Sequence, residues 1–103
     1  MRTFPRELAE FRNIVNSRGQ GLRELSIFGL LQADKGPTEH ISVGAKNATI
    51  SIIVQLRSDG RYRVVIQGFM DAWIGRSVAL DGFYKNADGT VEPMPDEEFY
   101  EFD

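Results

Sequence analysis

Cysteine is absent from this chain of 103 residues, and histidine occurs once. Without cysteine the protein has no disulfide, no thiol nucleophile and no cysteine-ligated metal. The single histidine, His40, follows Glu39 at the start of a predicted strand, with neither a nucleophile nor an orienting partner at a useful spacing. We therefore interpret His40 as a surface residue and expect no catalytic residue, no metal and no cofactor.

The chain also lacks long hydrophobic runs. No apolar stretch reaches the roughly 20 residues that a membrane-spanning helix needs, and residues 1–4 do not begin a secretory signal. Asn47-Ala48-Thr49 matches the glycosylation sequon, which without a secretory route is a chance match. With 42% hydrophobic and 26% charged residues, we expect one folded α+β domain over residues 1–103, in the cytoplasm and with no membrane partner.

Positive charge is scarce in the last part of the chain. The net charge is −3, but residues 1–23 carry five arginines and two glutamates, whereas residues 86–103 carry seven carboxylates and no base. Nucleic-acid binding needs clustered lysine and arginine, so we expect no nucleic-acid partner. The most distinctive element is the acidic segment 96–103, which also contains Phe99, Tyr100 and Phe102.

An amphipathic pattern predicts a helix over Pro5–Arg18. Apolar residues recur along one stripe at helical spacing: Phe4, Leu8, Phe11, Ile14 and Val15. Thr3 can cap this helix and Gly19 can end it. The segment Leu22–Ala33 is ambiguous, because its alternation and Gly29 favour a strand while Leu22, Leu25 and Phe28 also share a helical face. We expect a strand there, with a short helix as the alternative.

Residues 49–82 read at a period of two as three antiparallel strands. A three-residue loop at Ser58-Asp59-Gly60 sets Leu56 opposite Tyr62, Val54 opposite Val64 and Ile52 opposite Ile66. A loop at Asp71-Ala72-Trp73 then sets Ile66 opposite Val78 and Val64 opposite Leu80. A turn at Lys46-Asn47 sets Val43 beside Ile50 and Ile41 beside Ile52, and a turn at residues 86–89 pairs Tyr84 with Val91. Pro93 and Pro95 should end the sheet.

This register predicts one apolar face that forms the core under the N-terminal helix. It contains Ile41, Val43, Ile50, Ile52, Val54, Leu56, Tyr62, Val64, Ile66, Val78 and Leu80. The predicted fold is therefore an α+β meander, with an N-terminal helix packed on one face of a five- or six-stranded antiparallel sheet.

The second face of this sheet is predicted to be half apolar. Its four rows are Thr49, Phe69 and Gly75; Ser51, Gln67 and Ser77; Ile53, Val65 and Ala79; and Gln55, Arg63 and Asp81. Arg63 and Asp81 form a favourable cross-strand pair in this register. A face exposed to solvent would be polar throughout, so Phe69 and the apolar row need a cover. Three covers are possible: the C-terminal segment or another part of the same chain, a second copy in a homodimer, or a ligand.

The candidate ligand or interface residues all lie on this face or at its loop. They are Ile53, Arg63, Val65, Gln67, Phe69, Trp73, Ala79 and Asp81. Asp71 and Asp81 are expected at opposite ends of one strand, so they form no acid–base pair. We also predict that residues 97–102 are ordered, with Phe99, Tyr100 and Phe102 packed on the domain or on a partner subunit and their acids near the N-terminal arginines. An added edge strand and a solvated tail are the alternatives.

The sequence therefore favours a binding or interaction protein over an enzyme, self-associating through the second face as a homodimer. The alternative is a pocket on that face for a small apolar ligand, with a possible catalytic role. Less favoured is an inhibitor whose acidic tail mimics nucleic acid.

Overall fold

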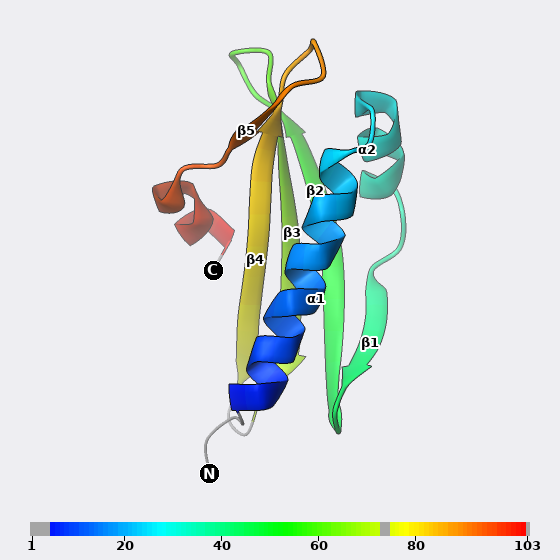
Figure 1. Ribbon diagram of the computed structural model, residues 1–103, viewed down its shortest axis with the longest axis vertical. Helices are drawn as coiled ribbons and strands as arrows, with labels where there is room; N and C mark the ends of the chain where they lie inside the picture. The colour runs from blue at the N-terminus through cyan, green and yellow to red at the C-terminus, as the bar shows by residue number, and fades with distance from the viewer. Residues whose placement is uncertain (1–4, 73–74, 103) are drawn as a thin grey trace.

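The structure is a computed structural model that describes residues 5–72 and 75–102. Two helices, α1 (Pro5–Arg23) and α2 (Ile27–Asp34), precede the strands β1 (Glu39–Val43), β2 (Lys46–Leu56), β3 (Tyr62–Asp71), β4 (Arg76–Lys85) and β5 (Val91–Pro93). A 3-10 helix, η1 (Asp96–Phe102), follows. The strands form one antiparallel sheet in the order β1-β2-β3-β4-β5, and α1 crosses it (Figure 1). The predicted α+β meander is confirmed, with five strands.

Helix α1 is longer than the sequence predicts. Phe11 and Val15 are buried along its sheet-facing stripe, as expected from their spacing, but the helix passes Gly19, buries Leu22 as well and ends at Arg23. Gly19 is required by a close approach: a Cβ atom there would lie 1.8 Å from Oδ2 of Asp81 on β4. Contrary to the prediction, Gly19 therefore does not end the helix but allows α1 to pack closely on the sheet. Thr3 and Phe4 lie outside the described residues.

The strand predicted over Leu22–Ala33 is wrong, and the helical alternative is correct. Ser26 caps α2 by accepting a hydrogen bond of 3.1 Å from the backbone N–H of Gly29, and Leu30 is buried in the core. Asp34 at the end of α2 accepts a hydrogen bond of 2.9 Å from the backbone N–H of Val54. Since β1 pairs with β2 only as far as Ile50, α2 covers the part of the β2 edge that β1 leaves free.

The β2–β3 hairpin has the predicted register, with Leu56 opposite Tyr62 and Ile52 opposite Ile66. The β3–β4 register is wrong by three residues, because Ile66 lies opposite Asp81 and not Val78. The loop spans residues 72–75, where Gly75 has a φ of +72° and its carbonyl accepts a hydrogen bond of 3.2 Å from Ala72 N–H. An odd shift moves every β4 side chain to the opposite face.

Packing under α1 explains the observed β4 register. Gly68 lies opposite Ala79, and this pair of small residues leaves room for Phe11. A Cβ atom at Gly68 would lie only 2.6 Å from Cζ of Phe11. The shift also places Phe83 in the core and turns Val78 and Leu80 away from the helix, contrary to the prediction.

Two other turns differ in register from the prediction. The β1–β2 turn lies at Gly44-Ala45, where Gly44 has a φ of +60°, so Ile41 lies opposite Ala48 and Val43 opposite Lys46. This shift of register keeps both residues on the helix side. The turn at residues 86–89 is present, but Lys85 and not Tyr84 lies opposite Val91. Strand β5 ends at Pro93, as predicted.

The main core lies between α1, α2 and the sheet. Its buried members are Phe11, Val15, Leu22, Leu30, Val43, Ala48, Ile50, Val64, Ile66, Met70, Ala79 and Phe83. Ile41, Ile52 and Val54 pack against it as predicted. Leu56 does not, because it is 65% exposed at the end of β2.

Candidate functional site

On the second face, β2 and β3 supply the predicted rows. Thr49 lies opposite Phe69, Ser51 opposite Gln67, Ile53 opposite Val65, and Gln55 opposite Arg63. Because of the register shift, β4 completes these rows with Val78, Leu80, Gly82 and Tyr84. Ala79 and Asp81 therefore lie on the helix side, and the expectation that they share this face is wrong. Trp73 lies outside the described residues.

The C-terminal segment covers the apolar centre of the second face. Val65, Tyr84 and Met94 form a small buried cluster, against which Ile53, Leu80, Phe99 and Phe102 pack. Gln67 Nε2 donates a hydrogen bond of 2.7 Å to the backbone oxygen of Phe102. The segment is thus ordered on its own chain, but as a 3-10 helix and not as an edge strand. Tyr100 differs from the other two aromatics because it is 78% exposed.

Arg63 is the charged centre of this covered half, and its side chain is 2% exposed. Its guanidinium lies 3.0 Å from a carboxylate oxygen of Glu98 and 2.9 Å from one of Glu101. Gln55 Oε1 accepts two further hydrogen bonds of 3.1 and 2.7 Å from it. The predicted Arg63–Asp81 pair is wrong, because Asp81 on the other face binds Arg23 at 2.7 Å.

Within the described residues, the tail acids Glu98 and Glu101 bind Arg63 and not the N-terminal arginines, contrary to the prediction. Among the described residues, Arg18 pairs with Glu39 and Arg23 with Asp81. Asp103 lies outside the described residues.

Tyr84 links this charge cluster to the buried apolar cluster. Its hydroxyl donates a hydrogen bond to the Glu98 carboxylate. This bond, together with that from Arg63, lowers the pKa of Glu98 from its ordinary value of 4.5 against the opposing effect of desolvation. Burial and the hydrogen bond to Glu98 raise the pKa of Tyr84 above its ordinary 10.0. Both shifts favour the ionised carboxylate and the neutral phenol, which keeps η1 attached to β3 and β4.

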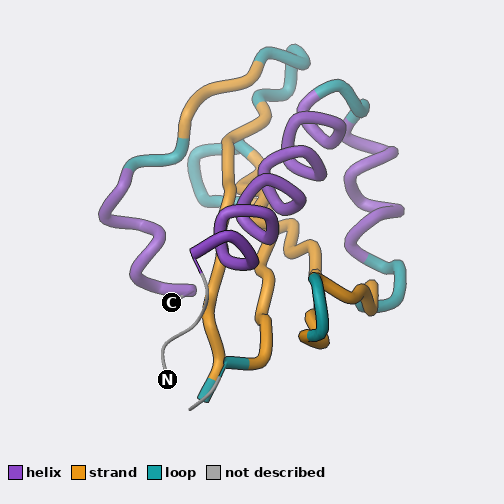
Figure 2. The backbone as a smooth tube through the Cα atoms, turned by 60° about the horizontal axis from the view of Figure 1, so that its bottom comes forward, coloured by secondary structure: helices purple, strands orange, loops and turns teal. Residues whose placement is uncertain are grey.

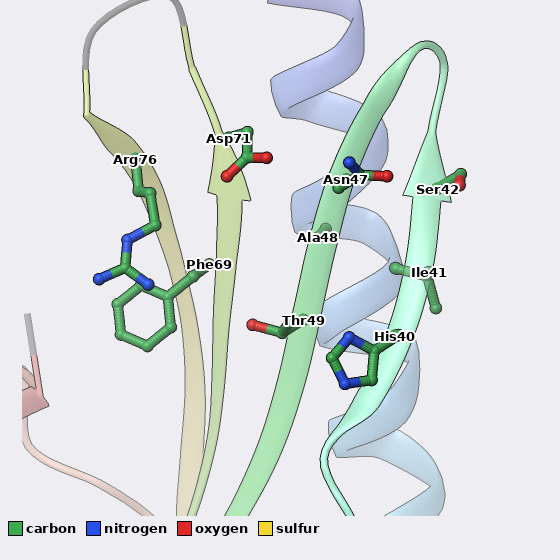
Figure 3. Close-up of a pocket in the computed structure, with 9 residues that line it drawn as sticks. All are labelled: His40, Ile41, Ser42, Asn47, Ala48, Thr49, Phe69, Asp71 and Arg76. Atoms are coloured by element: carbon green, nitrogen blue, oxygen red, sulfur yellow. The ribbon is translucent and has the colours of Figure 1, made fainter.

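The other half of the second face is open and forms a hollow of about 450 Å³, which we call the open-half pocket. It is lined by His40, Ile41, Ser42, Asn47, Ala48, Thr49, Phe69, Asp71 and Arg76 (Figure 3). The Arg76 guanidinium lies 4.8 Å from the centroid of the Phe69 ring. In Figure 3 the hydroxyl of Thr49 lies between this pair and the imidazole of His40, which comes from the neighbouring strand.

Sequence reasoning placed Phe69 on this face but missed Arg76 and His40. Asp71 was expected only as a turn residue, yet it ends β3 opposite Arg76. The signal for His40 was available, because the period-two reading of β1 puts it on the same side as Thr49, its partner on β2. Arg76 could not be assigned without the correct β4 register.

The described polar groups differ between the two halves of the face. The side chains of Arg63 and Tyr84 both bind that of Glu98, and that of Gln67 donates to the backbone oxygen of Phe102. Among residues 5–72 and 75–102, His40, Asp71 and Arg76 form no side-chain hydrogen bond or ion pair. That part of the chain also contains no group of three or more potential metal ligands. The open-half pocket therefore offers a cation, an anion, an imidazole and an aromatic ring for binding.

Comparison with protein-family models, with curated proteins and with solved structures finds no match to this chain. Within the described residues, no helix has the length and apolar character required to cross a membrane. Fold and site together therefore define a small α+β protein with one covered and one open half of its second sheet face.

Proposed function

We propose that this protein is a binding protein, and that its open-half pocket takes a small zwitterionic molecule with an apolar body. The observation that carries the proposal is the contrast along the second face. Polar groups in the half under η1 are paired, whereas His40, Asp71 and Arg76 form no side-chain hydrogen bond or ion pair among the described residues and border one hollow. Convergent polar groups around an aromatic residue in a hollow of this size are typical of ligand sites.

The charges of the pocket favour a zwitterion over a simple anion or cation. Arg76 can bind a carboxylate through its fork of N–H groups, and Asp71 can accept from an ammonium group. The charges of Arg76 and Asp71 are opposite, so an ion of a single sign gains from one residue and is repelled by the other. Phe69, which is partly exposed, offers its ring to an apolar body. The hydroxyl of Thr49 can donate or accept a hydrogen bond.

Self-association through the second face is the other function that the sequence predicts. The apolar row that favours it is partly occupied by the chain itself, because Phe99 and Phe102 pack beside Val65. We therefore rank the homodimer below the small-molecule site. An inhibitor that mimics nucleic acid also has less support, since Glu98 and Glu101 bind Arg63 of the same chain.

The test is an NMR titration of the full chain with L-phenylalanine, which carries the three required groups. We expect chemical-shift changes at Thr49, Phe69 and Asp71 that saturate at millimolar ligand. Arg76→Gln and Asp71→Asn should each weaken binding by about tenfold, the effect of losing one charge-assisted hydrogen bond. Shifts that are absent, or equal in both variants and the parent, contradict the proposal.

A matched control separates zwitterion binding from general charge effects. Arg57→Gln removes one positive charge from an exposed site in the β2–β3 turn region, remote from the pocket lining, and should leave the affinity unchanged. Sedimentation in parallel reports the mass. A dimer whose formation is abolished by Phe69→Ser, with no response to phenylalanine, favours the self-association instead.

A further inference from the structure

The outer edge of β4 is only partly paired. Strand β5 lies opposite Phe83, Tyr84 and Lys85, and within the described residues no other strand pairs with β4 on this side. Residues 76–82 therefore have a free edge. Sheet edges carry backbone N–H and C=O groups that can pair with another extended chain.

The hydrogen bonds around this edge identify which backbone groups point outward. In an antiparallel ladder, alternate residues direct N–H and C=O to the same side. Asn86 N–H donates 2.9 Å to the carbonyl of Thr90 on the β5 side, so even-numbered β4 residues face outward. Gly82 obeys this rule, and its two groups are satisfied by side chains: its N–H donates 2.9 Å to Asp81, and its carbonyl accepts at 3.3 Å from Arg23. Val78 and Leu80 are the next outward-facing residues.

A groove of about 510 Å³ runs along this part of the edge. Its base is Val78, Ala79 and Leu80; Arg12 and Asn16 of α1 line one wall, and Asp96, Phe99 and Tyr100 at η1 line the other. Figures 1 and 2 show β4 between α1, which crosses the sheet, and η1, which lies beyond the β4 edge. The stretch Ser77-Val78-Ala79-Leu80 contains no charge and no proline, so it lacks the usual protection of an edge strand.

We propose that this groove binds an extended peptide segment of a partner protein, which adds to the sheet as a strand antiparallel to β4. Its backbone pairs with the N–H and C=O groups of Val78 and Leu80. This site is distinct from the open-half pocket, and the inference does not depend on the proposed function.

The two walls specify the side chains of that peptide. Residues opposite Val78 and Leu80 point to the η1 side, where Leu80 and Phe99 belong to the apolar cluster and Tyr100 is exposed. The residue between them points to the α1 side, toward Arg12. Arg12 is exposed and forms no ion pair among the described residues. The groove therefore fits an apolar–acidic–apolar sequence.

A second copy of this chain fits less well than an isolated peptide. Its own β4 edge lies between its own α1 and η1, so pairing of the two edges brings four helical segments to one seam. In contrast, a single extended segment needs only the space between the two walls of one molecule. The acidic centre of the segment also matches Arg12, whereas Ala79, the helix-side residue of the free edge between Val78 and Leu80, carries no charge.

The experiment uses an acetylated and amidated peptide with the sequence Ser-Val-Glu-Val-Ser and the full-length protein. In the free protein we expect the amides of Val78 and Leu80 to exchange rapidly with solvent and that of Ala79 to be protected by β3. Adding the peptide should slow exchange at Val78 and Leu80 at least tenfold. N-methylation of both peptide valines, which removes the pairing donors but keeps the side chains, should abolish this effect.

Charge exchange tests the orientation of the peptide. Arg12→Glu should weaken binding of the glutamate peptide by about fivefold, and a peptide with lysine at its centre should recover the loss. Protection of Val78 and Leu80 in the free protein at low concentration overturns the proposal, as does an N-methylated peptide that binds equally well. Protection that rises with protein concentration alone shows that the occupant is a second copy and overturns the partner peptide.

Discussion

Removal of η1 by truncation after Pro95 tests whether the C-terminal segment is part of the folded structure. The deletion removes Phe99 and Phe102, which are partly buried on Val65, and two carboxylates that bind Arg63. A fully buried aromatic side chain contributes about 1.5–3 kcal/mol, so two half-buried ones contribute about 2 kcal/mol together. The ion pairs add about 1 kcal/mol, because Glu98 and Glu101 keep 22% and 54% of their side-chain surface exposed.

We therefore expect the truncated chain to lose about 3 kcal/mol of unfolding free energy. For a domain of this size that corresponds to a fall in Tm on the order of 15 °C. Thermal unfolding followed by circular dichroism measures it, with urea unfolding as a second determination. Tyr100→Ser is the matched control: its side chain is 78% exposed, so the change should stay within about 0.5 kcal/mol. A truncated chain that melts within about 2 °C of the parent refutes the reasoning, because η1 then contributes nothing to the fold.

Two further predictions concern pH and packing. Folding lowers the pKa of Glu98 below 4.5 and raises that of Tyr84 above 10.0, so their stabilisation is full between these values. It is lost as pH falls through the folded pKa of Glu98 or rises through that of Tyr84, and Glu98→Gln should flatten the acid side of a plot of urea midpoint against pH. Gly68→Ala should cost about 1–3 kcal/mol, since its Cβ meets Phe11 at 2.6 Å. Gly21→Ala should instead stabilise α1 by about 0.5–1 kcal/mol, because a Cβ atom there has no neighbouring atom within 4 Å. If urea unfolding shows the same change in stability for Gly68→Ala and Gly21→Ala, the packing explanation is wrong.

The sequence determines the β2–β3 hairpin because local and cross-strand signals agree. Gly60 has a φ of +88°, as the predicted three-residue loop requires, and that loop alone aligns apolar with apolar residues on both strands. For β4 no such agreement exists. Val78 and Leu80 point to one side of β4 and Ala79 points to the other. The predicted and the observed registers therefore both place apolar residues under the helix. Contacts distant in sequence, between Gly68 and Phe11 and between Asp81 and Arg23, decide the register.

The candidate site was likewise predictable on β2 and β3 but not on β4. Thr49, Gln67, Phe69 and Arg63 were placed correctly because they lie on β2 and β3. The association of the acidic tail with an arginine was predictable from charge, but the choice of Arg63 was not. An arginine in a strand interior reads as an exposed residue. Its burial follows from contacts distant in sequence, with Glu98, Glu101 and the ring of Phe102, whose centroid lies 5.0 Å from the guanidinium.

The position of η1 in the chain has a consequence for folding. Every strand pairs with its neighbour in sequence, so the sheet can form hairpin by hairpin without η1. The segment that covers Val65, Ile53 and Leu80 comes after all of them. A folding intermediate in which the sheet has formed but η1 has not yet docked therefore exposes this apolar row, and another apolar surface can bind there in place of η1.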